Sequence, residues 1–482
     1  MSIWRKKPIS AFEADMKKSD LKRVLGKWSL TAIGIGAIIG GGIFVLTGKV
    51  AHYNAGPALA LSFVVAGIAC IFAALCYAEF ASMLPVEGSA YAYAYGTVGE
   101  VFAWLIGWGL ILEYGMGAMT VAVSWSGYFN KLLGLFGLKI PAEFTNAPFD
   151  QTPGYMNLPA FLITWVVTSI LVKGIKEAAS TNNIIVILKV SAILFVILVG
   201  MFFIKVSNWI PFIPEPEMIK GEDGNMHQAY GVQGIFAGAA SIFFAYIGFD
   251  AVSTQAGEAI NPKKDMPFAI IASLLICTVL YIAVALVLTG MMNYKEFTGE
   301  DLKAPVAAAF QKNGIDWAMY IITAAATAGL ISVMLVMMLG QTRIFLGMAK
   351  DGLLPDFFKA IHKSFKTPYK STLLVGLVVS LVAAFAPLTV LGDMTSFGTL
   401  FAFAMVCGAV WLLRVKEPNV ERPFKVPALP LIASLGVMVN LLLIINLDKR
   451  AQLLATGWML LGVIVYFAYS KKNSNLEKEI KA

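Results

Sequence analysis

The chain has 482 residues, of which 58% are hydrophobic and only 14% are charged. A soluble protein carries about 25% charged residues, so this composition excludes an ordinary soluble protein and indicates one that crosses a membrane many times. The four cysteines fall inside apolar runs without metal-ligand spacing, and the sequence holds no nucleophile–base pair, P-loop or cofactor motif, so we expect no enzyme, metal or cofactor.

Residues 1–28 are polar and basic, and we predict a cytoplasmic N-terminal arm. Its charge is explained by membrane topology alone or by an amphipathic helix on the lipid surface. Twelve apolar runs long enough to cross a bilayer follow the arm. They cover about 30–48, 57–84, 98–128, 157–173, 182–204, 232–256, 268–291, 316–342, 371–387, 394–414, 427–446 and 451–470.

Lysine and arginine residues indicate the orientation of these spans. Of the 37, 26 lie on segments that share the side of the N-terminus, 10 lie on the opposite side, and Lys189 lies within a span. This bias predicts a multi-pass plasma-membrane protein with both termini, including a tail at 471–482, in the cytoplasm. The net charge of +8 therefore reflects topology and not nucleic-acid binding.

Glycine interrupts two of the apolar spans. Gly40, Gly41 and Gly42 lie in the first span, and Gly248 lies in the sixth. Each glycine costs about 1 kcal/mol relative to alanine in a helix interior, and freed backbone groups are tolerated at membrane depth only where protein or a water-filled cavity satisfies them. We therefore predict an unwound segment at Gly40 to Gly42. Close helix packing through Gly36 and Gly40 is the alternative, but paired breaks in two halves favour a transporter binding site.

The predicted transmembrane domain, residues 29–470, divides into two sets of five spans. These sets cover about 29–205 and 230–414, and two extra helices follow at 427–470. Because five is odd, the second set begins on the opposite side of the membrane, which predicts an inverted repeat. We expect an all-α integral membrane protein with discontinuous helices 1 and 6.

Several stretches of the chain together carry a resemblance to a known family. They are Gly34-Ile35-Gly36-Ala37-Ile38-Ile39-Gly40, Tyr77-Ala78-Glu79-Phe80 with Gly88-Ser89-Ala90-Tyr91, Phe244-Ala245-Tyr246-Ile247-Gly248-Phe249-Asp250, Glu258-Ala259-Ile260-Asn261-Pro262, and Arg343-Ile344-Phe345 with Ala349-Lys350-Asp351-Gly352-Leu353-Leu354-Pro355. With these stretches in this order, the chain resembles the amino acid–polyamine–organocation superfamily from about residue 25 to 470, and within it a bacterial form of the cationic amino acid transporters. The resemblance implies the leucine-transporter fold, with five plus five helices in an inverted repeat and two more helices. One departure is Gly41, where the family often has alanine or serine.

A broken helix offers the groups that an amino acid needs. Free amides at a helix start bind anions, and free carbonyls at a helix end face a cation. The breaks and the family motif mark the same residues. We predict that the substrate carboxylate binds the amides of Gly41, Gly42 and Ile43, and that its ammonium group binds the carbonyls of Ile38, Phe244, Ala245 and Ile247.

Phe244 lies just before the second break. The resemblance implies that this residue is an aromatic gate over the substrate. A phenylalanine packed in the core or against lipid is the alternative in a chain with 32 of them.

Lys189 lies within the fifth span, and an ionisable residue inside a membrane is a functional candidate. A lysine near the inner end of a span could instead extend to the interface. In some family members a lysine takes the place of a sodium ion, so the resemblance implies that the ammonium group lies between spans 1 and 8. Because burial disfavours the charged form, Lys189 could exchange a proton during transport, which would be proton-coupled and sodium-independent.

Glu113 lies near the middle of the third span, where a lone carboxylate must be paired or protonated. We assign it to proton coupling with Lys189, and three roles stay open: contact with the substrate side chain, a pair with Lys189, or hydrogen bonding as a neutral acid.

Asp250, Glu258 and Arg343 lie toward the inner ends of spans 6 and 8. We interpret them as candidate partners of an intracellular gate, with ordinary helix-end charges as the alternative. Glu79 is a similar but weaker candidate.

Met319, Thr323 and Ala326 share one face of the eighth span and are predicted to line the side-chain pocket. These residues are neutral, so the pocket suits a small neutral amino acid such as alanine better than the cationic substrates that the subfamily name suggests. We expect a proton-coupled symporter of L-amino acids, small neutral and/or cationic ones, that works by alternating access. An exchanger, a uniporter, a sodium-coupled symporter and an amino-acid sensor remain alternatives. The expected partners are the substrate and membrane lipids; no protein partner is identified.

Overall fold

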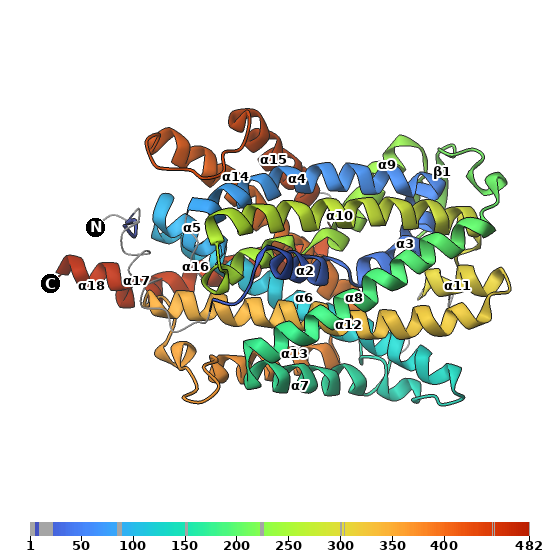
Figure 1. Ribbon diagram of the computed structural model, residues 1–482, viewed down its shortest axis with the longest axis horizontal. Helices are drawn as coiled ribbons and strands as arrows, with labels where there is room; N and C mark the ends of the chain where they lie inside the picture. The colour runs from blue at the N-terminus through green and yellow to red at the C-terminus, as the bar shows by residue number, and fades with distance from the viewer. Residues whose placement is uncertain are drawn as a thin grey trace.

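The computed structural model describes residues 5–8, 23–83, 89–149, 153–221, 226–298, 301–302, 304–445, 447 and 449–481. Most of the predicted N-terminal arm lies outside these residues. Long helices run along one direction through the molecule, with loops and short elements at the two ends (Figure 1).

Each of the twelve predicted spans coincides with helical structure. Eight stretches of the described residues are long and apolar enough to cross a membrane, and the first of them, Lys27–Met83, includes the first two predicted spans. Three further apolar helices are shorter. The helices are α2 (Lys27–Ile38), α3 (Thr47–Val50), α4 (Leu59–Met83), α6 (Glu100–Leu135), α7 (Leu158–Lys173), α8 (Ile175–Gly200), α9 (Gly231–Ile242), α10 (Pro262–Met291), α12 (Asp316–Lys350), α13 (Tyr369–Phe385), α14 (Leu388–Lys416), α15 (Leu429–Ile445) and α16 (Lys449–Val465).

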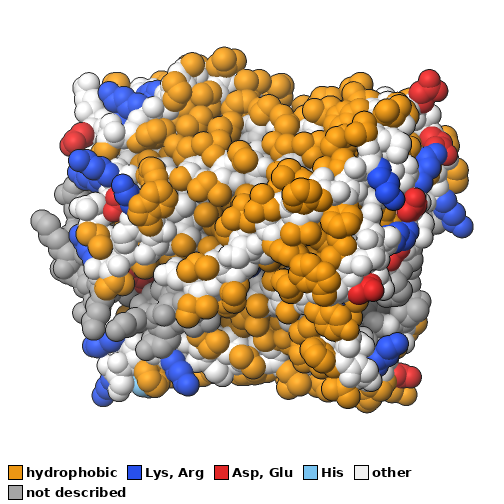
Figure 2. Space-filling view, turned by 45° about the vertical axis from the view of Figure 1, so that its right-hand side comes forward, with side chains coloured by type: hydrophobic (Ala, Val, Ile, Leu, Met, Phe, Trp, Pro, Cys, Tyr) orange, Lys and Arg blue, Asp and Glu red, His pale blue; other side chains and the backbone are white. Residues whose placement is uncertain are grey.

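The outer surface is apolar around the middle of the bundle. Figure 2 shows hydrophobic side chains over the centre of one face and charged side chains gathered toward the two ends. On α8, for example, Ile184, Ile187 and Leu198 are all more than half exposed. A soluble monomer rarely exposes contiguous apolar patches of such extent, so this surface fits a lipid environment.

The broken first helix lies inside the bundle. α2 packs against α8, α10 and α12, while α6 packs against α12 and α14. Because long helices enclose α2 on several sides, the backbone groups freed at its break face protein and not lipid, as membrane depth requires.

A small sheet departs from the all-α expectation. Strand β1 (Glu217–Lys220) pairs antiparallel with β2 (Met226–Ala229), with Glu217 opposite Ala229 and Lys220 opposite Met226. The hairpin lies in the polar loop between α8 and α9, at the same end of the bundle as α11 (Pro305–Lys312) (Figure 1). Outside the apolar belt, a loop can satisfy its backbone by pairing strands, so the hairpin is a local addition to a fold that is mostly helical in the described residues.

Both termini lie at the opposite end of the bundle, where buried Glu100 connects them. Its carboxylate accepts hydrogen bonds from the Arg5 guanidinium (3.0 Å), the Tyr466 hydroxyl (2.9 Å) and the Ser474 hydroxyl (2.5 Å). Arg5 also forms an ion pair with Glu477 of the C-terminal helix α18 (Asn475–Lys481). The two termini therefore share one end, as the even number of spans predicts.

The short helix α5 (Ala90–Thr97) completes this end. The Tyr91 hydroxyl donates to Asp351 (2.7 Å), and the Tyr95 hydroxyl donates to Glu100 (3.2 Å). Burial, together with the nearby charges of Asp351 and Glu100, raises the pKa of Tyr95. Both effects favour the protonated phenol, which can donate to Glu100.

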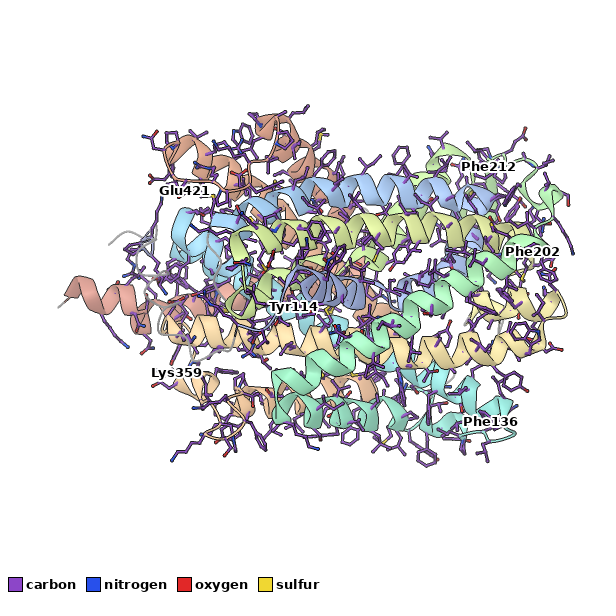
Figure 3. All side chains as sticks on the ribbon, in the orientation of Figure 1. Tyr114, Phe136, Phe202, Phe212, Lys359 and Glu421 are labelled. Carbon is purple, nitrogen blue, oxygen red and sulfur yellow. The ribbon has the colours of Figure 1, made fainter. Side chains whose placement is uncertain are left out.

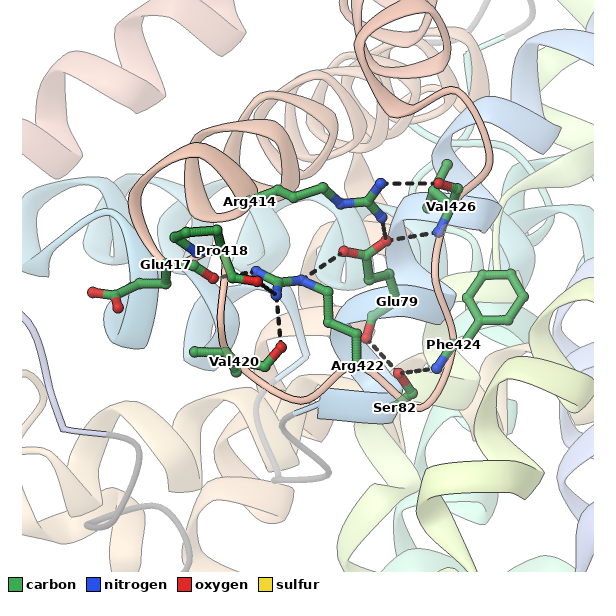
Figure 4. Close-up of polar contacts among 9 residues, drawn as sticks. All are labelled: Glu79, Ser82, Arg414, Glu417, Pro418, Val420, Arg422, Phe424 and Val426. Atoms are coloured by element: carbon green, nitrogen blue, oxygen red, sulfur yellow. Dashed lines mark hydrogen bonds and ion pairs between the residues drawn. The ribbon is translucent and has the colours of Figure 1, made fainter.

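Glu79, a weaker gate candidate, instead holds the loop between α14 and α15 (Figure 4). Its carboxylate contacts the guanidinium groups of Arg414 and Arg422 and accepts a hydrogen bond from the Val426 amide (2.7 Å). Arg422 in turn donates to three carbonyls of the same loop. Glu79 therefore anchors this loop, and its candidate role in a gate stays a prediction.

Candidate functional site

The first helix break begins one residue earlier than predicted. α2 ends at Ile38, and Ile39 is extended, with φ −73° and ψ 101°. Gly41 has already returned to helical angles, and Gly42–Leu46 forms a wide π-helical turn. The unwound segment is therefore Ile39–Gly40 and not Gly40 to Gly42, because Gly41 and Gly42 begin the next helical stretch. No side chain caps that helix start, which leaves its amides available to an anion.

Gly42 and Gly248 hold the two broken helices against each other. A Cβ atom added to Gly42 would overlap Cα and Cβ of Ala245, and one added to Gly248 would lie 2.8 Å from Cβ of Ala37. Gly248 also has a φ of +119°, which other residues rarely adopt. Each break therefore packs on the helix that carries the other break. The packing alternative named Gly36 and Gly40, and an added Cβ there would lie 2.7 Å from the Asn182 side-chain oxygen and 2.9 Å from a Val333 methyl group, so close packing and an unwound backbone occur together in this span.

A cavity lies where the two breaks meet. Except for Phe244, which is partly exposed, the residues that line it are buried. Its volume is about 20 Å³, space for about one or two water molecules. The predicted amino acid ligand would need more room, so its binding here would require Phe244 or the broken helices to move. The lining consists of Ala37, Ile38, Gly40, Gly41, Gly42, Gly117, Val121, Phe244, Ile247, Val333, Met337 and Thr395.

Two of the predicted carbonyl ligands converge on one hydroxyl group. The Tyr281 hydroxyl oxygen on α10 lies 2.8 Å from the carbonyl oxygen of Ile38 and 3.1 Å from that of Ala245. One hydroxyl has a single proton, and each carbonyl has two lone pairs, so acceptor capacity remains at both carbonyls. The carbonyl of Phe244 accepts the Ile247 amide (3.3 Å). Carbonyl groups from both breaks are thus brought close together.

Lys189 is fully buried and does not extend to the interface, so that alternative does not describe the structure. Its ammonium nitrogen lies 2.7 Å from the Gly36 carbonyl oxygen and 2.5 Å from that of Ile39. Its alkyl chain passes over Gly329 of α12, where an added Cβ would lie 2.7 Å from Cδ of the lysine. The ammonium group therefore lies between α2 and α12, at the end of α2 where helix carbonyls lose their partners.

Glu113 is completely buried beside a second acid. Its neighbour Tyr114 donates a hydrogen bond to Asp250 (2.6 Å), at the middle of the bundle (Figure 3). Among the described residues, neither carboxylate oxygen of Glu113 has a hydrogen bond of ordinary geometry, although the Thr399 hydroxyl lies nearby, and no contact joins Glu113 to Lys189. A buried lone carboxylate is costly, so this geometry fits a neutral acid better than a pair with Lys189.

The predicted gate residues separate into two groups. Glu258 and Arg343 form a buried ion pair of 2.8 Å, which joins the end of the sixth span to α12. Asp250 takes no part in that pair and bonds to Tyr114 instead. The backbone of Glu258 also accepts hydrogen bonds from Val24 and Leu25, ahead of α2. Both broken spans are therefore tied together near the end that carries the termini.

Met319 and Thr323 are buried on α12 but do not line this cavity, and neither does Ala326. The α12 residues that line it are Val333 and Met337. Thr323 precedes Val333 by ten residues, about 15 Å along a helix. The face of α12 that borders this cavity therefore lies nearer the terminal end of the bundle, and a side-chain pocket at Met319, Thr323 and Ala326 stays a prediction.

The sequence reasoning missed four polar residues around the breaks. Tyr281 and Tyr114 are described above; in addition, the Ser332 hydroxyl lies 3.1 Å from the Gly36 carbonyl and 3.0 Å from the side-chain oxygen of Asn182. All four lie inside helices of the apolar spans and are buried. Buried hydroxyl and amide groups nearly always have hydrogen-bond partners. A polar residue inside an apolar run was therefore the signal in the sequence that could have marked these four positions.

The sequence is similar to those of known permeases and transporters. A family model described as amino acid permease matches residues 25–469. The chain is 44% identical over 477 residues to a methylthioribose transporter of Bacillus subtilis, covering 99% of this chain and 100% of that protein. It is 44% identical over 480 residues to a branched-chain amino acid permease of the same organism, covering 99% of each chain.

A vacuolar cationic amino acid transporter of Arabidopsis thaliana is 39% identical over 427 residues, 88% of this chain and 64% of the plant protein. The names of these relatives are those of transporters and permeases, which confirms that the chain is not an enzyme.

Proposed function

Because this chain belongs to the amino acid permease family, we propose that it is a secondary active transporter that binds a neutral L-amino acid between its two broken helices. One observation carries the proposal. The two breaks place an uncapped helix start and the carbonyl groups of Ile38 and Ala245 around one cavity. The amides suit a carboxylate and the carbonyls suit an ammonium group, which are the two charged groups of every amino acid.

The proposed substrate is neutral, because the cavity offers no partner for a charged side chain. Among the described residues that line it, Thr395 supplies the one side-chain hydroxyl, and none is charged. A cationic side chain would lose its hydration there without a compensating acid. Aliphatic amino acids from alanine to the branched-chain ones fit this lining, and the branched-chain permease relative supports them. We therefore propose that this chain, although similar to cationic amino acid transporters, does not carry cationic substrates.

The proposed coupling ion is the proton. The ammonium group of Lys189 occupies a position between α2 and α12 where a cation bridges backbone carbonyls. Loss of its proton would weaken that bridge, so protonation can be linked to the arrangement of the two helices. Glu113, buried beside Asp250, is the second candidate for proton transfer.

The proposal also includes the arrangement of the protein in the membrane. We propose twelve spans in the leucine-transporter arrangement, alternating access, and cytoplasmic termini in the plasma membrane.

Methylthioribose is a second candidate substrate, since a relative of 44% identity carries the name of a methylthioribose transporter. The carbonyl groups at the breaks argue for an ammonium-bearing substrate instead, so we rank the amino acid first.

Uptake of labelled alanine by liposomes that contain the purified protein tests the proposal. An inward proton gradient should drive uptake, and a sodium gradient should have no effect. Unlabelled leucine and isoleucine should compete, whereas arginine and lysine should not. Uptake driven by sodium would overturn the coupling, and competition by methylthioribose alone would favour the second candidate. Binding without flux would indicate a sensor.

A further inference from the structure

The wall of the cavity formed by α6 contains an unfilled space next to Gly117. An ideal Cβ atom built on this glycine would lie 3.5 Å from the Thr395 methyl carbon and 3.6 Å from the Met337 sulfur. These are ordinary van der Waals distances, so one methyl group fits between α6, α12 and α14 without displacing a neighbour. The chain leaves that space empty, and it borders the cavity.

The groups around this space are apolar and adaptable. The Thr395 hydroxyl donates to the Leu391 carbonyl (2.7 Å), so its proton is already engaged and its methyl group meets the space. Met337 has a flexible thioether side chain, a type that fills irregular gaps and tolerates different neighbours. Val121, one turn along α6 from Gly117, lines the same wall. A ligand group that enters this space therefore meets carbon and sulfur and no free charge.

We propose that Gly117 determines the size limit of the substrate side chain, and that its missing methyl group makes room for branched aliphatic side chains. The inference rests on the proposed function and narrows its substrate class. A branched side chain carries one methyl more than a linear one at the branch point, and the space at Gly117 has the size of one methyl. The side chain of alanine is a single methyl group that does not need the space next to Gly117, so alanine binding depends less on this space.

The test compares Gly117→Ala with Gly115→Ala. Gly115 lies on the same helix, and an added Cβ there meets nothing within 4 Å, so the control adds the same methyl outside the cavity. In liposomes that take up labelled alanine, the inhibition constants of unlabelled isoleucine and alanine are measured for wild type and both variants. The ratio of the isoleucine constant to the alanine constant should rise at least about tenfold in Gly117→Ala, since one methyl in an apolar pocket changes discrimination about 10- to 200-fold. It should stay within twofold in Gly115→Ala.

Three outcomes would overturn the inference while leaving the proposed function intact. The first is an unchanged ratio in Gly117→Ala. The second is an equal shift in Gly115→Ala, which would place the effect outside the cavity. The third is a Gly117→Ala protein that no longer folds or takes up either amino acid, because the methyl-sized space would then not exist. If the wild-type protein itself takes up neither amino acid, the proposed function fails instead.

Discussion

At the scale of single residues, Lys189 explains how the end of α2 is stabilised inside the bundle. The last carbonyls of a helix carry partial negative charge and lack partners within the helix. Lys189 places an ammonium group on two of them, those of Gly36 and Ile39. The same contact provides an ionisable group at the point where the first span changes direction. Stability of the break and coupling to protons therefore depend on one side chain.

We predict that Lys189→Ala abolishes uptake driven by a proton gradient while leaving some substrate binding or exchange. The reason is that the variant removes the group that we assign to proton exchange but keeps the backbone around the cavity. Uptake is measured in liposomes with and without an imposed proton gradient. Ile187→Ala on the exposed face of α8 is the control and should behave as wild type. Proton-driven uptake by Lys189→Ala at the wild-type rate would contradict the assignment.

Adjacent glycines of the first break should respond differently to the same methyl group. A Cβ on Gly42 would overlap the backbone of Ala245, whereas a Cβ on Gly41 would lie 3.6 Å from its nearest neighbour, the Ser124 hydroxyl. Gly42→Ala should therefore lose about 3 kcal/mol of stability, the upper part of the usual range for overpacking, and Gly41→Ala less than about 1 kcal/mol. Thermal unfolding of the purified variants in detergent measures both. Equal losses in the two variants would refute the proposed contact between the breaks.

At the scale of elements, α10 connects the two broken helices through Tyr281. The two carbonyls that it contacts belong to different breaks, Ile38 in the first and Ala245 in the second. A change in the arrangement of α2 relative to the second break therefore alters the hydrogen bonding of one hydroxyl group. This contact lets a third helix respond to the state of the substrate cavity.

Tyr281→Phe should lower the free energy of unfolding by about 1 kcal/mol, the usual net value of a buried hydrogen bond. It should also weaken amino acid binding, because the carbonyl groups of Ile38 and Ala245 lose the hydroxyl group that holds them together. Tyr246→Phe is the matched control, since its hydroxyl donates to Phe63 on α4 (2.8 Å) and not to a predicted ligand. We expect a similar loss of stability there without loss of affinity. Ligand-induced thermal stabilisation measures both effects. Equal affinities in the two variants would show that Tyr281 acts on stability alone.

At the scale of the whole molecule, the buried pair of Glu258 and Arg343 helps to close the end that carries the termini. Removal of one partner leaves a buried charge without compensation, at a cost of about 3–5 kcal/mol. Glu258→Gln should therefore reduce stability strongly. Glu217→Gln, which breaks an exposed pair with Lys295 at the other end, should cost less than about 1 kcal/mol. Thermal unfolding separates the two cases, and a Glu258→Gln protein as stable as Glu217→Gln would contradict this role.

Much of this architecture could be predicted because membrane depth restricts what a chain can do. Apolar runs of this length had to form helices, and glycines in the middle of such a run had to interrupt the helix or allow another helix to pack closely against it. Gly248 lies at the second break as expected, whereas the first break moved to Ile39 because Gly42 packs on Ala245.

The features that could not be predicted depend on contacts between distant segments. α12 is apolar on all sides, so its sequence could not indicate that Val333 and Met337 are the residues of this helix that border the cavity. The role of Tyr281 required two carbonyls more than 200 residues apart in the chain to meet.

We propose that one small cavity serves as the binding site and opens to one side of the membrane at a time. Counterflow measures this directly: liposomes are loaded with unlabelled alanine, diluted into labelled alanine, and the label inside is followed over time. We expect a transient accumulation of label above its outside concentration, saturating with substrate, because unlabelled alanine inside competes with the label for the inward-facing site and so slows the exit of the label. Uptake that only approaches the outside concentration, without stimulation by internal alanine, would contradict alternating access and indicate a pore.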